Sequence, residues 1–133
     1  MPGTDRVGRS ALHYAAVQGR ADDIQALIDS GADIDLPDED GRTPLHFAAQ
    51  QYQVRSAELL CRAGADVQAR DKFGNTALWR ATFDSQGRGD LIQLLLASGA
   101  DPDAANDSGV SPRQLAERIG NCDVKQFCTP TTG

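Results

Sequence analysis

The sequence predicts an all-α solenoid of about four helix-turn-helix units joined by β-hairpin-like turns. Three observations support this fold class. Similar segments recur about every 33 residues, each contains two short apolar stretches with helical spacing, and a Gly-Ala-Asp triplet begins at Gly31, Gly64 and Gly99. A fixed period of this length is the signature of stacked repeats. We therefore expect a single domain over residues 1–128, with repeats at about 8–40, 41–73, 74–108 and 109–128, and a disordered tail at 129–133.

The second repeat shows the pattern most clearly. Thr43 and Pro44 form a helix start, because a threonine hydroxyl can accept a hydrogen bond from an orphan backbone N–H and proline at the first helical position needs no donor. Apolar residues within 45–49 then share one face of a short helix. A second apolar group, at 57–61, is followed by Gly64, which suits the left-handed position that ends a helix. The polar stretch after it is too short for a third helix and predicts a hairpin-like turn.

The first and last repeats carry charged residues where an internal repeat is apolar. We expect the first repeat to act as its own N-terminal cap, with Arg20 and Asp23 facing water. In the fourth repeat Arg113 replaces a leucine and Glu117 a small residue, which indicates a polar C-terminal cap.

These residues identify a resemblance. The segment Thr43–Ala49, TPLHFAA, and the three Gly-Ala-Asp triplets resemble the ankyrin repeat over roughly Asp5–Phe127. The resemblance implies that His13 and His46 bond within the turn network and are neither bases nor ligands. Tyr52 stands where ankyrin repeats usually have glycine, so either the turn changes shape or packing holds Tyr52 in a left-handed conformation.

Two further departures from the repeat pattern concern packing. Ser56 replaces the usual aliphatic residue, so the helix pair of the second repeat is expected to pack less tightly. In the third repeat Trp79 takes the place of the histidine, and the connection at 83–89 is longer and rich in glycine. We expect Trp79 to fill the space between the third and fourth repeats, while the longer loop is a candidate for binding.

The resemblance also implies a concave binding surface made of the hairpin tips and the exposed faces of the first helices. Tyr14, Phe47 and Arg80 should border this groove, half-buried between helices. Phe73 is the sharpest candidate, because an exposed aromatic ring beside charges is typical of interface hot spots, although it could fold back on the neighbouring tip. The partner-binding candidates are Arg6, Val7 and Arg9; Glu39, Asp40, Arg42, Gln50 and Gln51; Lys72, Phe73, Asn75, Phe83 and Asp84; and Asp107, Ser108 and Val110.

The turn at 33–41 is dense in carboxylates. Its spacing does not fit a calcium loop, because Pro37 and Asp38 fall where an Asp and a Gly are needed. We interpret it as an acidic tip from which Asp38, Glu39 and Asp40 protrude toward arginines of a partner.

The net charge is −6 and the isoelectric point about 4.7, which argues against a nucleic acid or an anionic membrane as partner and favours a protein with a basic or mixed surface. No apolar run is long enough for a membrane span and the first ten residues lack a signal core, so we expect a cytoplasmic protein. Cys61, Cys122 and Cys128 lack zinc spacing and are interpreted as structural thiols.

The sequence contains no nucleophile elbow, phosphate-binding glycine loop or metal motif, so we expect no catalysis and no cofactor. The chain resembles short stand-alone ankyrin-repeat proteins of bacteria through Trp79–Phe83 and Asp123–Phe127, and some such proteins are immunity proteins that cover the active site of a toxin. The leading hypothesis is a monomeric inhibitor or immunity-type protein that binds one partner through its concave face. A general adaptor is the alternative, and an enzyme or small-molecule binder is less favoured.

Overall fold

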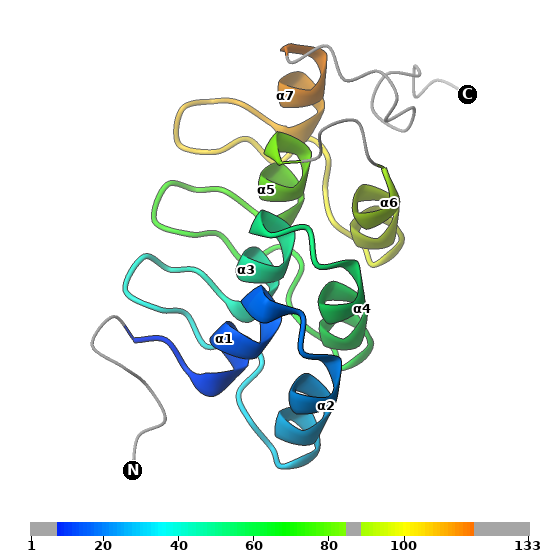
Figure 1. Cartoon of the computed structure of the whole chain (residues 1–133). Helices are drawn as coiled ribbons and strands as arrows, with labels where there is room; N and C mark the ends of the chain where they lie inside the picture. Colours follow the sequence, from blue (N-terminus) through cyan, green and yellow to red (C-terminus); the bar gives the residue numbers. More distant parts are fainter. Residues whose placement is uncertain (1–7, 85–88, 119–133) are drawn as a thin grey trace.

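The computed structural model describes residues 8–84 and 89–118, which form seven α-helices and no β-strand (Figure 1). The helices are α1 (Ala11–Gln18), α2 (Ala21–Asp29), α3 (Pro44–Gln50), α4 (Val54–Arg62), α5 (Ala77–Phe83), α6 (Asp90–Ala97) and α7 (Pro112–Arg118). None of the described helices is long and apolar enough to cross a membrane.

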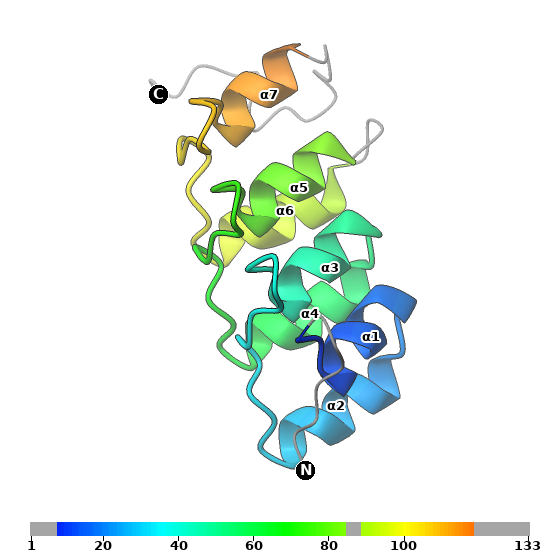
Figure 2. The ribbon, with the colours of Figure 1, turned by 90° about the vertical axis from the view of Figure 1, so that its left-hand side faces the viewer.

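The helices stack in two layers. An inner layer places α1, α3, α5 and α7 side by side, and an outer layer places α2, α4 and α6 behind them (Figures 1 and 2). The inner helices α1, α3 and α5 each pack on the outer helix that follows and on the inner helix of the next repeat. This arrangement confirms the predicted all-α repeat solenoid.

The inner helices begin where the sequence predicts. Thr43 precedes α3 and its hydroxyl accepts a hydrogen bond from the N–H of His46 at 3.4 Å, while Thr76 does the same for the N–H of Trp79 at 3.2 Å. Pro44 occupies the first helical position of α3, where its missing N–H costs nothing. After α4 the chain leaves the helix through Gly64 at φ +93°, a conformation that a side chain would disfavour.

Tyr52 occupies the turn between α3 and α4 in the left-handed region, at φ 54°. Packing holds it there, which is one of the two outcomes that the sequence predicted. Its ring packs against the core, and its hydroxyl donates a hydrogen bond to Asp90 at 3.0 Å and accepts one from the N–H of Leu91 at 3.3 Å. Tyr52 therefore ties the second repeat to the first turn of α6 in the third.

The core lies between the two layers. Its largest fully buried side chains are aliphatic and alternate between inner and outer helices: Leu12, Ile24, Leu45, Leu60, Leu78, Leu91, Ile92 and Leu95. Ser56 lies among them fully buried, and its hydroxyl has no hydrogen-bond partner among the described residues. Cys61 is half-buried against the same core, and burial raises the pKa of its thiol, which agrees with a structural role.

The two end repeats expose charge. Arg20 and Asp23 lie in water as an ion pair at 3.6 Å, and Arg113 on α7 pairs with Asp103 at 2.8 Å. The proposed repeat boundaries and the tail at 129–133 remain predictions, because residues 1–7, 85–88 and 119–133 lie outside the described part of the chain. Cys122 and Cys128 also lie outside the described residues, so their expected role as structural thiols remains a prediction.

Candidate protein-binding face

Three hairpin tips project from the inner helices (Figure 1). Each is closed by a backbone hydrogen bond, from the N–H of Asp38 to the carbonyl of Arg42, from Asp71 to Asn75 and from Asn106 to Val110. We call residues 38–42, 71–75 and 106–110 the tips, and the surface formed by the tips and the inner helices the groove face.

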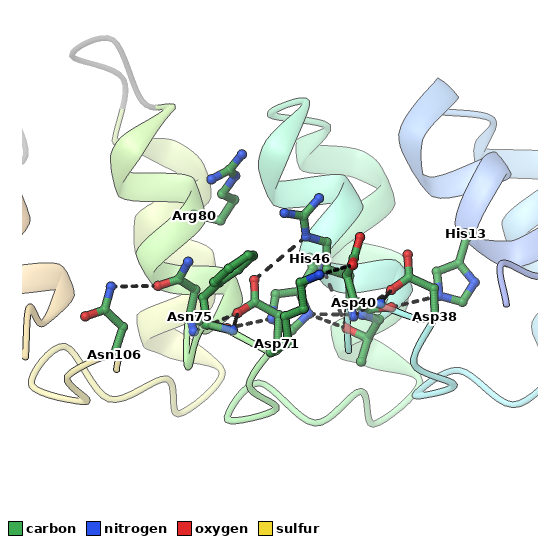
Figure 3. A network of polar contacts seen from close by, with 12 residues as sticks. His13, Asp38, Asp40, His46, Asp71, Asn75, Arg80 and Asn106 are labelled. Carbon is green, nitrogen blue, oxygen red and sulfur yellow. Dashed lines mark hydrogen bonds and ion pairs between the residues drawn. The ribbon is translucent and has the colours of Figure 1, made fainter. Parts of the chain in front are cut away.

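One polar side chain at the start of each tip organises its backbone. The carboxylate of Asp38 accepts hydrogen bonds from the N–H groups of Asp40 at 2.9 Å and Arg42 at 3.0 Å. Asp71 accepts from Phe73 and Asn75 at 2.9 and 3.0 Å, as Figure 3 shows for the row of labelled tip residues. Their side chains are only 1% and 4% exposed.

This corrects the expectation that Asp38 protrudes toward a partner. Asp38 points inward because its oxygens replace water for N–H groups that the tight turn leaves without a carbonyl partner. Asn106 does the same in the third tip, bonding the N–H groups of Ser108 and Val110 at 3.0 Å each. The signal was present in the sequence, because Asp38, Asp71 and Asn106 occupy equivalent positions of successive repeats.

His13 and His46 join each inner helix to the next tip, as expected from the turn network. His13 Nε2 lies 3.0 Å from the carbonyl oxygen of Arg42, and His46 Nε2 lies 2.8 Å from that of Asn75. The Nδ1 atoms accept from the N–H groups of Ser10 and Thr43, so each ring carries its proton on Nε2. Burial lowers the pKa of both histidines, which keeps them neutral at pH 7.

Backbone and side-chain bonds also link one tip to the next. The N–H of Lys72 donates to the carbonyl of Asp40 at 2.8 Å, and its ammonium group lies 2.8 Å from the Asp40 carboxylate. The N–H of Asp107 donates to the carbonyl of Phe73 at 3.0 Å. The groove face is thus a continuous, hydrogen-bonded surface across successive repeats.

Cations lie over aromatic rings along this face. The charged groups of Arg9, Lys72 and Arg80 lie 5.0, 5.3 and 5.4 Å from the ring centroids of Phe47, Phe73 and Phe83, respectively. Such contacts hold each charged group against the face of a ring.

The large exposed hydrophobic side chains of the described residues all belong to the tips or the inner helices. Phe73 is 50% exposed, Phe83 52% and Tyr14 41%. Phe73 is therefore exposed as predicted, whereas Tyr14 is more exposed than the half-buried state expected and Phe47 is buried. Arg80 is partly exposed and pairs with Asp84 at 3.3 Å.

Trp79 does not behave as expected. It is partly exposed and stacks on Phe83, with centroids 5.6 Å apart and planes 12° apart. Its indole N–H is buried without a hydrogen-bond partner among the described residues, whereas the Nε2 atoms of His13 and His46 each face a backbone carbonyl. The expectation of a satisfied core residue between the third and fourth repeats was wrong.

A hollow of about 210 Å³ opens on the groove face between the first two inner helices. We call it the α1–α3 hollow. Its lining comes from the tip side and from both helices: Arg9, His13, Tyr14, Val17, Arg42, Phe47, Gln50 and Gln51.

The partner-binding candidates are thus only partly brought together. The hollow unites Arg9, Arg42, Gln50 and Gln51, whereas the other exposed candidates are spread over the tips and α5: Glu39, Lys72, Phe73, Phe83, Asp107 and Ser108. Asp40, Asp84 and Val110 are partly exposed. Arg6 and Val7 lie outside the described residues.

Asn75 was wrongly placed among the surface contacts. It is buried, and its backbone carbonyl and N–H bond His46 and Asp71. Its side-chain oxygen accepts a hydrogen bond from Asn106 at 2.8 Å (Figure 3). The sequence could not separate it from Arg42, which occupies the equivalent position and is partly exposed.

Within residues 8–84 and 89–118, no group of three or more His, Cys, Asp or Glu side chains could hold a metal ion. The described polar groups on the groove face are engaged in building turns or remain as separate donors and acceptors. The arrangement suits recognition of another surface.

The chain was compared with known proteins. No curated protein matches it. The family model described as ankyrin repeats, in three copies, matches residues 12–106, which is more than half of the chain. Ankyrin repeats indicate a protein–protein interaction module. The repeated helix pairs, the tips and this match together show that the chain belongs to the ankyrin-repeat family.

Proposed function

We propose that the chain is a non-catalytic protein that binds one partner through its groove face and blocks that partner's activity, as an inhibitor or immunity-type protein does. The observation that carries the proposal is the placement of the exposed aromatic rings. Tyr14, Phe73 and Phe83 all lie on the inner helices or tips. Exposed aromatic residues set among charges are typical of binding hot spots.

The groove face is also prepared for binding before a partner arrives. The first two tips are held by buried carboxylates and the third by the amide of Asn106, and the cations of Arg9, Lys72 and Arg80 are oriented by rings and acidic partners. A surface that is already ordered loses less conformational entropy on association. Exposed Glu39 and Asp107 on the tips would meet basic groups, so the partner surface that fits best is basic or mixed.

The test is affinity capture from a lysate of the source cells with the wild-type chain, followed by measurement of affinity for the captured protein. A Phe73→Ala, Phe83→Ala double variant should bind at least about tenfold more weakly, since central aromatic anchors contribute most of the binding energy. The matched control is a Gln25→Ala, Gln93→Ala double variant on the outer helices α2 and α6, which should bind as the wild type does.

The captured protein then decides the finer function. Loss of its enzymatic or toxic activity in the complex would support an inhibitor or immunity-type role. Several partners of moderate affinity would favour an adaptor instead. Equal binding by wild type and the phenylalanine double variant, with loss in the outer-helix control, would contradict the groove face as the binding surface.

A further inference from the structure

The α1–α3 hollow carries a positive charge on a protein whose net charge is negative. Two arginines line it and no Asp or Glu does. Arg9 and Arg42 occupy equivalent positions in the first two repeats, at the edge of the groove face. The hollow therefore presents the opposite charge to the chain as a whole, which is −6.

The acidic partners of these arginines lie behind them. Arg9 Nε lies 3.3 Å from Asp38, and Arg42 Nε lies 3.8 Å from Asp71. Both carboxylates are almost fully buried and each already accepts two backbone hydrogen bonds. They orient the arginines from the protein side, and their burial keeps them out of direct contact with a group that enters the hollow.

Arg42 retains capacity to bind a ligand. Its ion pair with Asp71 is long, at 3.8 Å, and involves only Nε. The structure shows no partner for the two terminal nitrogens of Arg42 among the described residues. A guanidinium group can grip both oxygens of a carboxylate through two parallel N–H bonds. The positive field reaches the neighbouring tip, where the pKa of Asp40 is lowered first by its hydrogen bond to Lys72 and further by the charges of Lys72, Arg42 and Arg9.

A second group in the hollow is a hydrogen-bond acceptor that lacks a donor. The side-chain oxygen of Gln50 is buried and accepts no hydrogen bond among the described residues. After a turn of the Gln50 side chain into the hollow, it would accept the backbone N–H of a bound peptide. Tyr14, Val17 and Phe47 supply an apolar wall between the polar groups, suited to the methylene groups of a side chain.

The size of the hollow limits what it can hold. Its volume of about 210 Å³ is below the roughly 300–1,000 Å³ typical of small-molecule sites. A cation, an unpaired acceptor and an apolar wall in a space of this size fit one acidic residue on a peptide. We propose that the α1–α3 hollow binds a glutamate side chain of the partner protein, with its carboxylate on Arg42 and its backbone N–H on Gln50.

This inference rests on the proposed function and adds to it the chemistry of one contact. The partner surface would be mixed, with basic groups facing Glu39 and Asp107 on the tips and one acidic residue entering the hollow. The glutamate would fix the register of the partner on the solenoid, because a buried charge pair tolerates little displacement.

The probe is a set of three acetylated and amidated peptides, Ala-Glu-Ala, Ala-Gln-Ala and Ala-Lys-Ala, titrated into the full chain with observation by NMR. The glutamate peptide should bind at least about fivefold more tightly than the glutamine peptide, because hydrogen bonds to a charged group are stronger. The lysine peptide should bind most weakly. The signals of the Arg42 and Gln50 side chains should move on addition of the glutamate peptide.

Variants separate the hollow from a general charge effect. Arg42→Gln should abolish the preference for glutamate, and Arg42→Lys should keep part of it. The fold should survive both changes, since Asp71 keeps its two backbone bonds. Arg55→Gln, on the exposed face of α4, removes the same charge elsewhere and should leave the preference unchanged.

The inference is overturned if the glutamate peptide shows no saturable binding, no preference over glutamine, or the same preference in Arg42→Gln. The native partner distinguishes this failure from failure of the proposed function. A partner lost by the Phe73→Ala, Phe83→Ala variant but held unchanged by Arg42→Gln would leave the proposed function standing and remove the glutamate contact.

Discussion

At the scale of single residues, the two histidines of the inner helices act as neutral bridges between repeats. Each accepts a backbone N–H on Nδ1 and donates from Nε2 to a carbonyl in the next repeat. A proton added to Nδ1 would face that N–H donor. Burial and this geometry both disfavour the charged ring, and the structure thereby couples folding to pH.

The coupling predicts that acid weakens the fold near neutral pH. In the folded chain the pKa of His46 lies below the ordinary value of 6.5, chiefly because of burial. The unfolded chain therefore binds more protons between these two pKa values. The contribution of His46 to stability is complete above about pH 6.5 and is lost as the pH falls from there through the folded-state pKa.

Denaturant unfolding at a series of pH values from 7.5 to 5 measures this effect. One proton corresponds to a slope of at most about 1.4 kcal/mol per pH unit. His46→Gln should be less stable at pH 7.5 but should flatten the slope, because glutamine does not titrate. Glutamine is a natural replacement, since Gln114 occupies this position in the fourth repeat and accepts the N–H of Ser111 at 2.9 Å. An unchanged slope would show that His46 is not the group responsible.

The role of a residue could be predicted where its position in the repeat fixes its contacts. It could not be predicted where the contacts depend on residues that pack around it in the folded chain. The bonding of His13 and His46 followed from their place in the repeat. Asp38 and Asn75 were assigned to the surface because a sequence shows charge and polarity but not the unpaired N–H groups inside a turn. Trp79 was misplaced because replacing a histidine by a larger ring leaves its direction undetermined.

At the scale of elements, the first residues of the helices could be predicted directly from the sequence. Threonine followed by proline specifies both the cap and the first helical residue, and the structure places α3 accordingly. The turn at Tyr52 could not be settled in advance, because its shape depends on Asp90 and α6, which lie far along the chain.

The left-handed conformation of Tyr52 leads to a prediction about this turn. Tyr52→Ala and Tyr52→Gly both lose the ring contacts and the hydrogen bond to Asp90, but only alanine keeps a Cβ at φ 54°. Tyr52→Ala should therefore be less stable than Tyr52→Gly by about 1 kcal/mol. Urea unfolding of the two variants measures the difference. Equal stability would mean that the turn relaxes to negative φ once the ring is gone.

At the scale of the whole molecule, both sides of the stack carry both signs of charge, with Glu39 and Asp107 exposed at the tips and Arg55 and Arg62 exposed on the outer helix α4. The outer helix α2 exposes Asp22, Asp23 and Asp29, while the groove face carries oriented arginines with their carboxylates buried behind them. The amino-acid composition gave only the sum of these charges. A net charge of −6 favours a partner with a basic or mixed surface, but it does not reveal the two arginines of the α1–α3 hollow, because burial decides which charges a partner meets.

Among the described residues, only the central repeats pack on another repeat on both sides. This decides how much each repeat contributes to the stability of the fold. Leu60 on α4 and Leu27 on α2 occupy the same position, four residues before the glycine that ends each outer helix. Leu60 is fully buried on α4, which packs between α2 and α6, whereas Leu27 is partly exposed and lines two hollows of the first repeat.

The same substitution at these two positions should therefore have different costs. Leu60→Ala leaves a closed cavity and should lower the free energy of unfolding by about 2–5 kcal/mol. Leu27→Ala removes methyl groups that already touch water and should cost about 1–2 kcal/mol. Denaturant unfolding at pH 7.5 compares the two, with Phe73→Ala at an exposed tip as the control that should change stability least. If the two leucine variants were equally destabilised, the first repeat would have a further neighbour in solution, and the nearest-neighbour account of the stack would have to include it.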